Sequence, residues 1–73
     1  MKYCPFCLEQ GIINFARIKD TDIEIYICDE CDTIWKTRDI TKEKGERFDE
    51  FMKKINRRAI WNELVDIRYM NND

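Results

Sequence analysis

The residues of this 73-residue chain that could do chemistry are concentrated in two cysteine pairs. Cys4 and Cys7 lie in "YCPFC", Cys28 and Cys31 lie in "YICDECDTIW", and the chain has no other cysteine. Each C-x-x-C turn presents two sulfurs, and two such turns complete a tetrahedron around one metal ion. The spacing therefore predicts a four-thiolate site, which suits zinc and, in the same geometry, iron.

The residues after each pair bear on which metal is bound and on what it does. Rubredoxin-type iron sites usually carry glycine there, whereas this chain has Leu8 and Asp32. We therefore expect one zinc ion, with iron as the less favoured alternative. Because four thiolates fill every coordination position, no site remains for water or substrate, which predicts a structural metal.

Two residue types that commonly carry catalysis are absent. The chain contains no histidine and no serine, so Ser–His and Cys–His nucleophile pairs and the commonest general base are missing. We expect a protein that is not an enzyme, with no catalytic residues and no small-molecule substrate.

Length and composition indicate a small globular protein that needs a staple. A chain this short buries only about 60% of its unfolded surface, so a metal commonly completes its stability. No apolar run reaches the roughly 20 residues of a membrane span, and no secretory signal is evident. We expect a single domain over residues 1–73 in the cytoplasm, with no membrane partner, where metal ligation is favoured over disulfides.

The two halves of the chain differ in charge. Residues 1–35 hold three Lys/Arg and seven Asp/Glu, a net of −4, and residues 36–73 hold ten and eight, a net of +2. Four thiolates around a divalent ion make the first half more acidic still. An acidic metal-binding half does not attract a phosphate backbone.

The hydrophobic pattern between the cysteine pairs predicts a β-hairpin. Residues 12–18 are rich in β-branched and aromatic types, residues 19–22 are polar turn residues, and residues 23–27 alternate strictly. Residues 33–37 predict a third short strand. The hairpin would return the chain to its start and place the second pair beside the first.

The rest of the chain predicts a linker over residues 38–45 and a helical extension over residues 46–70. An apolar stripe at helical spacing is formed by Phe48, Phe51, Met52 and Ile55. A second stripe, on the opposite side of a straight helix, is formed by Ile60, Trp61, Leu64 and Val65. We therefore expect two helices with a break near Asn56–Arg58, where Asn56 adopts the left-handed conformation. The alternative is one unbroken helix whose second stripe binds another protein.

The motifs "CPFC" and "YICDECDTIW", with the hairpin between them, resemble a zinc ribbon. The resemblance covers residues 1–37 and implies Cys4, Cys7, Cys28 and Cys31 as metal ligands. Together with the two apolar stripes, this predicts a small α+β fold, a zinc ribbon followed by two C-terminal helices. Zinc ribbons occur in many small transcription and adaptor proteins, so the resemblance implies a fold more than an activity. The helical half shows no such resemblance.

The function we predict is the binding of a protein partner. The candidate contact residues are Asp29, Glu30, Asp32 and Trp61. Acidic side chains complement a basic surface, and tryptophan is a favoured interface anchor. An adaptor, an immunity- or antitoxin-like inhibitor of a basic enzyme, and a transcription accessory protein all fit this prediction.

The alternative is a nucleic-acid-binding regulator. Its phosphate contacts would come from the basic segment "KKINRR", namely from Lys53, Lys54, Arg57 and Arg58.

Overall fold

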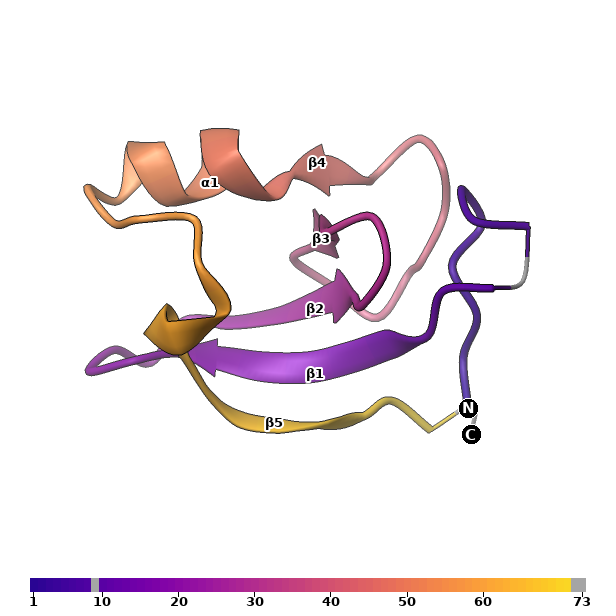
Figure 1. Cartoon of the computed structure of the whole chain (residues 1–73), viewed down its shortest axis with the longest axis horizontal. Helices are drawn as coiled ribbons and strands as arrows, with labels where there is room; N and C mark the ends of the chain where they lie inside the picture. The colour runs from indigo at the N-terminus through magenta and orange to yellow at the C-terminus, as the bar shows by residue number, and fades with distance from the viewer. Residues whose placement is uncertain (9, 72–73) are drawn as a thin grey trace.

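The structure, a computed structural model, describes residues 1–8 and 10–71 and is built on one five-stranded antiparallel sheet (Figure 1). The elements in chain order are β1 (Ile13–Ile18), β2 (Glu24–Cys28), β3 (Thr33–Trp35), β4 (Glu46–Arg47), α1 (Phe48–Lys54), the 3-10 turn η1 (Trp61–Glu63) and β5 (Leu64–Tyr69). The strands lie in the order β4-β3-β2-β1-β5. The sheet therefore has β2 at its centre and β4 and β5 at its edges.

The predicted hairpin and the predicted third strand are confirmed. β1 pairs with β2 in a register that sets Ile13 opposite Cys28, and β3 pairs with the other side of β2. The hydroxyl of Thr21 donates to the carbonyl of Ile18 at 2.8 Å and closes the turn, in which Asp20 has a φ of 62°. The register carries the second cysteine pair back to the start of the chain.

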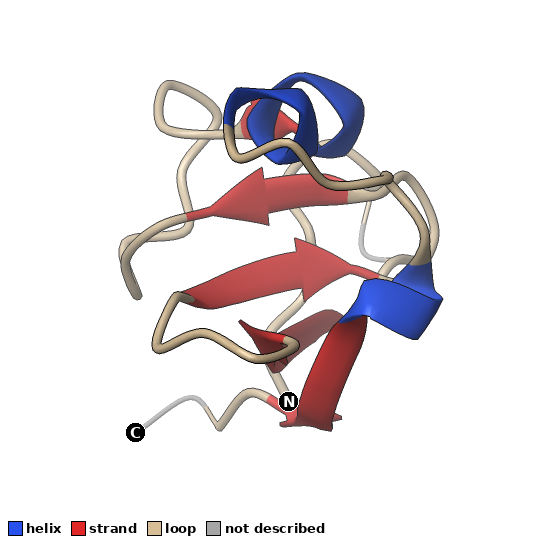
Figure 2. Ribbon diagram, turned by 90° about the vertical axis from the view of Figure 1, so that its left-hand side faces the viewer, coloured by secondary structure: helices blue, strands red, loops and turns tan. Residues whose placement is uncertain are grey.

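One face of the sheet packs against α1 to form the main core. Ile25 and Ile27 are fully buried on this face, as the alternation of β2 predicts. Phe51 and Met52 of the first predicted stripe cover them from α1. Figure 2 shows α1 lying over the sheet. The full cluster consists of Ala16, Ile18, Ile25, Ile27, Ile34, Phe48, Phe51, Met52 and Leu64.

A second, smaller cluster lies at the cysteine end of the sheet. Trp35 is fully buried there together with Ile13, and both pack with Cys4 and Cys28. Residues 38–45, which we expected to be a linker, contribute the buried side chain of Ile40 to this cluster. The Trp35 indole N–H donates to the carbonyl of Thr41 at 2.7 Å, which ties this segment to the sheet.

α1 ends where the sequence predicts a break. Asn56 has a φ of 58°, the left-handed conformation that closes a helix. Its N–H donates to the carbonyl of Lys53 at 3.1 Å, and the N–H of Arg57 donates to that of Met52 at 2.9 Å. These two bonds form a Schellman motif.

Within the described residues no helix is long and apolar enough to cross a membrane.

The prediction of a second C-terminal helix is wrong, and so is the alternative of one unbroken helix. After the break the chain forms η1 and then β5, which pairs with the free side of β1. Residues 46–70 are therefore not a helical extension. Val65, Ile67 and Tyr69 are weak helix formers and strong strand formers, and β1 supplies the hydrogen bonds that a strand needs. A bulge at Asp66, with a φ of 57°, accommodates the register shift.

Candidate metal centre

The hairpin brings the four cysteine sulfurs together at one end of the sheet. All four Sγ atoms lie within 4.8 Å of one another, with Cys4 3.8 Å from Cys31 and Cys7 3.7 Å from Cys28. These distances are far too long for disulfide bonds, which measure about 2.05 Å. Four sulfurs placed tetrahedrally at about 2.3 Å from zinc would be about 3.8 Å apart. The four cysteines could therefore hold one metal ion.

Backbone N–H groups surround the first sulfur of each pair. Phe6 donates to Sγ of Cys4 at 3.4 Å, and Glu30 donates to Sγ of Cys28 at 3.3 Å. In both turns the donor lies two residues after the cysteine. Hydrogen bonds of this kind favour the charged thiolate, which is the form that binds a metal.

The residue after each cysteine pair has the left-handed backbone conformation. The φ angles are 48° at Leu8 and 60° at Asp32. This conformation explains why glycine is common at these positions in related turns. Both turns form without glycine. The absence of glycine is therefore no argument for zinc over iron, contrary to our inference from the sequence.

Gly11 is a residue of the site that the sequence analysis did not single out. It is buried, and its carbonyl accepts the N–H of Cys4 at 2.9 Å. A Cβ atom at this position would lie 2.3 Å from Sγ of Cys28 and 3.1 Å from Sγ of Cys7. Only glycine leaves room for these two sulfurs. The one signal of this role in the sequence was the position of Gly11, four residues after Cys7.

The four thiols differ in exposure and in acidity. Burial raises the pKa of Cys4 to about 11, although the Phe6 N–H opposes the shift. Burial and the neighbouring thiols raise the pKa of Cys7 further. Cys31 is the most exposed of the four, and its partial burial also acts to raise its pKa. Hydrogen bonds with Thr33 outweigh this effect and bring the pKa of Cys31 to about 7. A metal-free site therefore holds protons at neutral pH, and a cation is needed to displace them.

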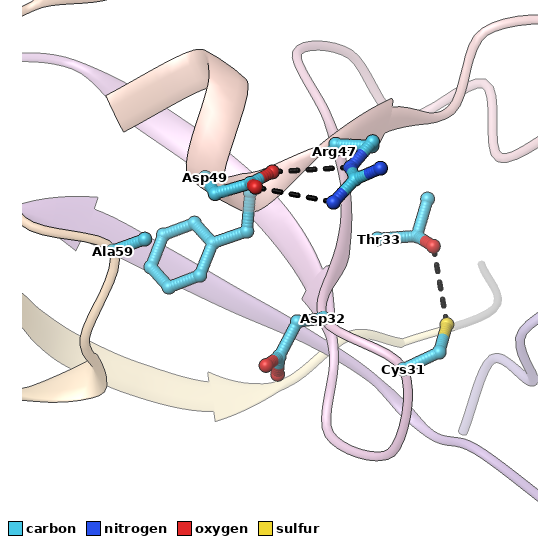
Figure 3. Close-up of a pocket in the computed structure, with 7 residues that line it drawn as sticks. Cys31, Asp32, Thr33, Arg47, Asp49 and Ala59 are labelled. Atoms are coloured by element: carbon cyan, nitrogen blue, oxygen red, sulfur yellow. Dashed lines mark hydrogen bonds and ion pairs between the residues drawn. The ribbon is translucent and has the colours of Figure 1, made fainter. Parts of the chain in front are cut away.

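Cys31 is the cysteine of the candidate site that lies nearest to solvent. Figure 3 shows it at the wall of a pocket of ≈ 350 Å³, with Sγ 3.1 Å from the Thr33 hydroxyl. Arg47 and Asp49, joined by hydrogen bonds of 3.1 and 3.2 Å, line the same pocket. The other three sulfurs are enclosed more deeply, since Cys4 and Cys28 are buried and Cys7 is half-buried.

The predicted partner-binding residues lie close to the metal centre. Asp29 accepts the N–H of Ile12 at 3.0 Å, and Asp32 accepts the indole N–H of Trp61 at 3.0 Å. Glu30 is exposed. Trp61 is half-buried and packs against the core under α1. Two of the three carboxylates therefore also help to position neighbouring segments.

The predicted nucleic-acid residues lie at the end of α1 and just beyond it. Lys53, Lys54 and Arg58 are exposed. Arg57 is partly enclosed and forms an ion pair with Glu63 at 3.2 Å. The basic segment is thus not a uniform positive surface.

Comparisons with models of protein families, with curated proteins and with solved structures find no match for this chain. The site is consequently interpreted from its own geometry.

Proposed function

We propose that this protein binds one structural zinc ion, in the manner of a zinc ribbon, and acts by binding a protein partner through its metal-bearing end. Sulfur spacings of 3.7 and 3.8 Å support a tetrahedral four-thiolate site. Zinc is the usual ion of structural sites made of cysteine alone. Four protein ligands leave no position for water or substrate, which supports a role other than catalysis.

The observation that carries the partner-binding proposal is the combination of two features at Leu8. Its side chain is 85% exposed, and its backbone is left-handed with a φ of 48°. The left-handed conformation costs a non-glycine residue roughly 1–2 kcal/mol. Folding alone would therefore favour glycine here, so an exposed leucine is best explained by a contact outside the chain.

Neighbouring side chains extend this apolar surface. Phe6 belongs to the same turn and Tyr3 lies just before it, and these two side chains are 45% and 48% exposed. Phe6 rests on Trp35 with ring centroids 6.2 Å apart, which limits its motion. Rigid exposed aromatic side chains are typical interface anchors.

The second cysteine turn adds negative charge beside this apolar surface. Its exposed acidic residues are Asp29, Glu30 and Asp32. A partner with an apolar pocket and a basic rim would complement both turns. An adaptor, an immunity- or antitoxin-like inhibitor of a basic enzyme, and a transcription accessory protein are the three forms that this surface suits.

The metal part of the proposal is tested by measuring metal content and ligation. We expect one zinc per chain in the purified protein, and X-ray absorption showing four sulfur neighbours at about 2.3 Å. Nitrogen or oxygen in the zinc shell, or iron as the metal that restores the fold best, would contradict it.

The partner part is tested with Leu8→Gly, a variant that should fold at least as well as the parent. We expect zinc-loaded wild-type protein, used as bait in an extract of its own cells, to retain a specific protein that Leu8→Gly does not retain. Ile60→Ala is the control, because Ile60 is 37% exposed and lies outside the cysteine turns. Equal retention by all three baits, or no retained protein, would reject a contact at Leu8.

A further inference from the structure

One sulfur of the candidate metal site is open to solvent, whereas the other three are enclosed to different degrees. Cys31 is exposed, Cys4 and Cys28 are buried, and Cys7 is half-buried. Cys31 also stands at the wall of the pocket of ≈ 350 Å³ drawn in Figure 3. A dissolved reagent therefore meets Cys31 before any other sulfur of the site.

The charge of this pocket limits the kind of reagent that it admits. Its lining includes one arginine, Arg47, and two carboxylates, Asp32 and Asp49. Arg47 is already joined to Asp49 by hydrogen bonds of 3.1 and 3.2 Å. The remaining negative charge disfavours anionic reagents. Hydrogen peroxide is small and uncharged, so neither the size nor the charge of the pocket opposes its approach to Cys31.

A second sulfur lies within reach of Cys31. The Sγ atom of Cys4 is 3.8 Å away, and an approach of about 1.8 Å would bring the two sulfurs to the S–S bond length of about 2.05 Å. Cys28, in the same turn as Cys31, is the other partner to consider. Its sulfur accepts the N–H groups of Glu30 at 3.3 Å and of Cys31 at 3.5 Å, whereas the sulfur of Cys4 accepts the N–H of Phe6 at 3.4 Å. Because hydrogen bonds that stabilise a thiolate also make it a weaker nucleophile, the structure favours Cys4 as the second sulfur.

We infer that Cys31 is an oxidation site, at which hydrogen peroxide forms a disulfide between Cys31 and Cys4 and so opens the candidate metal site. This inference rests on the proposed zinc site and names a means by which that site is controlled. It uses the exposure of Cys31 and the 3.8 Å separation of the two sulfurs.

The oxidation proceeds in two steps. In the first, the Cys31 thiolate attacks one peroxide oxygen and the O–O bond breaks, which gives a sulfenic acid and hydroxide. In the second, the Cys4 thiolate attacks the sulfenic sulfur, the S–S bond forms and a second hydroxide leaves. Two protons from solvent convert the hydroxides to water. Two thiolates thus lose two electrons in total, and one peroxide is reduced to two water molecules.

The disulfide removes half of the sulfur ligands of the proposed zinc site. Cys7 and Cys28 remain, whereas a structural zinc site needs four ligands. Zinc is therefore released, and the two cysteine turns lose the ion that joins them. A dithiol reductant reverses the step, because a disulfide is a reversible stage of cysteine oxidation.

The experiment adds one equivalent of hydrogen peroxide to the zinc-loaded protein and then blocks the remaining thiols by alkylation. A chromogenic chelator follows zinc release, and mass spectrometry of tryptic peptides locates the new bond. Trypsin leaves the first cysteine pair in residues 3–17 and the second pair in residues 20–36. A Cys4–Cys31 bond therefore links two peptides, whereas a bond within either pair links none. We expect the linked peptides, with the alkyl group on Cys7 and Cys28, one zinc released per disulfide, and recovery of zinc binding after reduction.

Variants and a labelling measurement test the order of reaction. Cys31→Ser should slow peroxide-driven zinc release at least about tenfold, because the exposed thiolate is absent. Cys7→Ser is the matched control, since it also removes one sulfur but keeps Cys4 and Cys31, and it should still give the linked peptides. A brief pulse of iodoacetamide on the zinc-loaded wild type needs no variant and should label Cys31 first.

Three results would overturn the inference while leaving the proposed zinc site intact. The first is a first disulfide that lies within one cysteine pair or joins Cys7 to Cys28. The second is zinc release at equal rates from wild type and Cys31→Ser. The third is a pulse that labels all four cysteines equally. Purified protein that contains no zinc is a different outcome, because it contradicts the proposed function itself and the inference with it.

Discussion

Replacing Gly11 with alanine should abolish metal binding by adding a single methyl group. The new Cβ would lie 2.3 Å from Sγ of Cys28, whereas nonbonded heavy atoms prefer about 3.5–4.0 Å. The sulfur would have to move by more than about 1 Å, although metal–ligand distances tolerate only about 0.2 Å. The Cys28 sulfur cannot rotate toward Cys7, because the Sγ of Cys7 already lies 3.7 Å away. We expect zinc affinity to fall at least about 100-fold, or about 2.8 kcal/mol.

The assay is competition between the protein and a chromogenic zinc chelator, with Gly45→Ala as the control. A Cβ at Gly45 would lie 2.9 Å from the Phe6 ring and 2.9 Å from the Thr33 methyl group. Both neighbours are side-chain carbon atoms and neither is a cysteine sulfur, so Gly45→Ala should reduce stability by about 1–3 kcal/mol and retain zinc affinity. If Gly11→Ala bound zinc within about threefold of wild type, the steric reasoning and the inferred sulfur positions would be refuted.

Three further outcomes follow from the structure. Met52→Ala should lower the free energy of unfolding by about 2–5 kcal/mol, because Met52 is fully buried between α1, to which it belongs, and the sheet, and urea unfolding of the zinc-loaded protein measures this. Asn56→Ala should lower the free energy of unfolding by about 1 kcal/mol, whereas Asn56→Gly should not, because the φ of 58° suits glycine. Equal effects of the two substitutions would contradict the left-handed cap. Zinc affinity should fall at least about 100-fold per pH unit below pH 7, since the raised pKa values of Cys4 and Cys7 keep both thiols protonated in the metal-free protein and zinc must displace both protons. A titration at pH 6 and pH 7 that gave equal affinities would exclude this proton competition.

The sequence was sufficient for the features that depend on local pattern. The cysteine spacing predicted the sulfur cluster, the alternation over residues 23–27 predicted β2, and the stripe beginning at Phe48 predicted α1. Asn56 was predicted to end the helix, and its φ of 58° confirms this. Each of these predictions rests on a turn, a period or a cap that is encoded within a few residues.

The features that failed depend on contacts between distant segments. Leu64 and Val65 belong to the second predicted helical stripe, yet residues 64–69 pair with β1, whose second side would otherwise lack hydrogen-bond partners. Strand formers such as Val65 and Ile67 were the local signal for this outcome. The role of Gly11 is likewise invisible in the chain, because the sulfur it accommodates belongs to Cys28, seventeen positions later.

The backbone of Ile13, at the cysteine end of the sheet, connects a segment near the start of the chain to a segment near its end. Its N–H donates to the carbonyl of Lys2 at 2.8 Å, and its carbonyl accepts the N–H of Met70 at 3.0 Å. A short peptide could therefore connect these segments, and the chain could be reopened at the β1–β2 turn. The connection between the cysteine pairs would lengthen from 20 to roughly 45 residues, at an entropic cost of only about 0.7 kcal/mol. The cluster of four cysteines thus depends on which strands meet in space and is nearly independent of the order in which the chain reaches them.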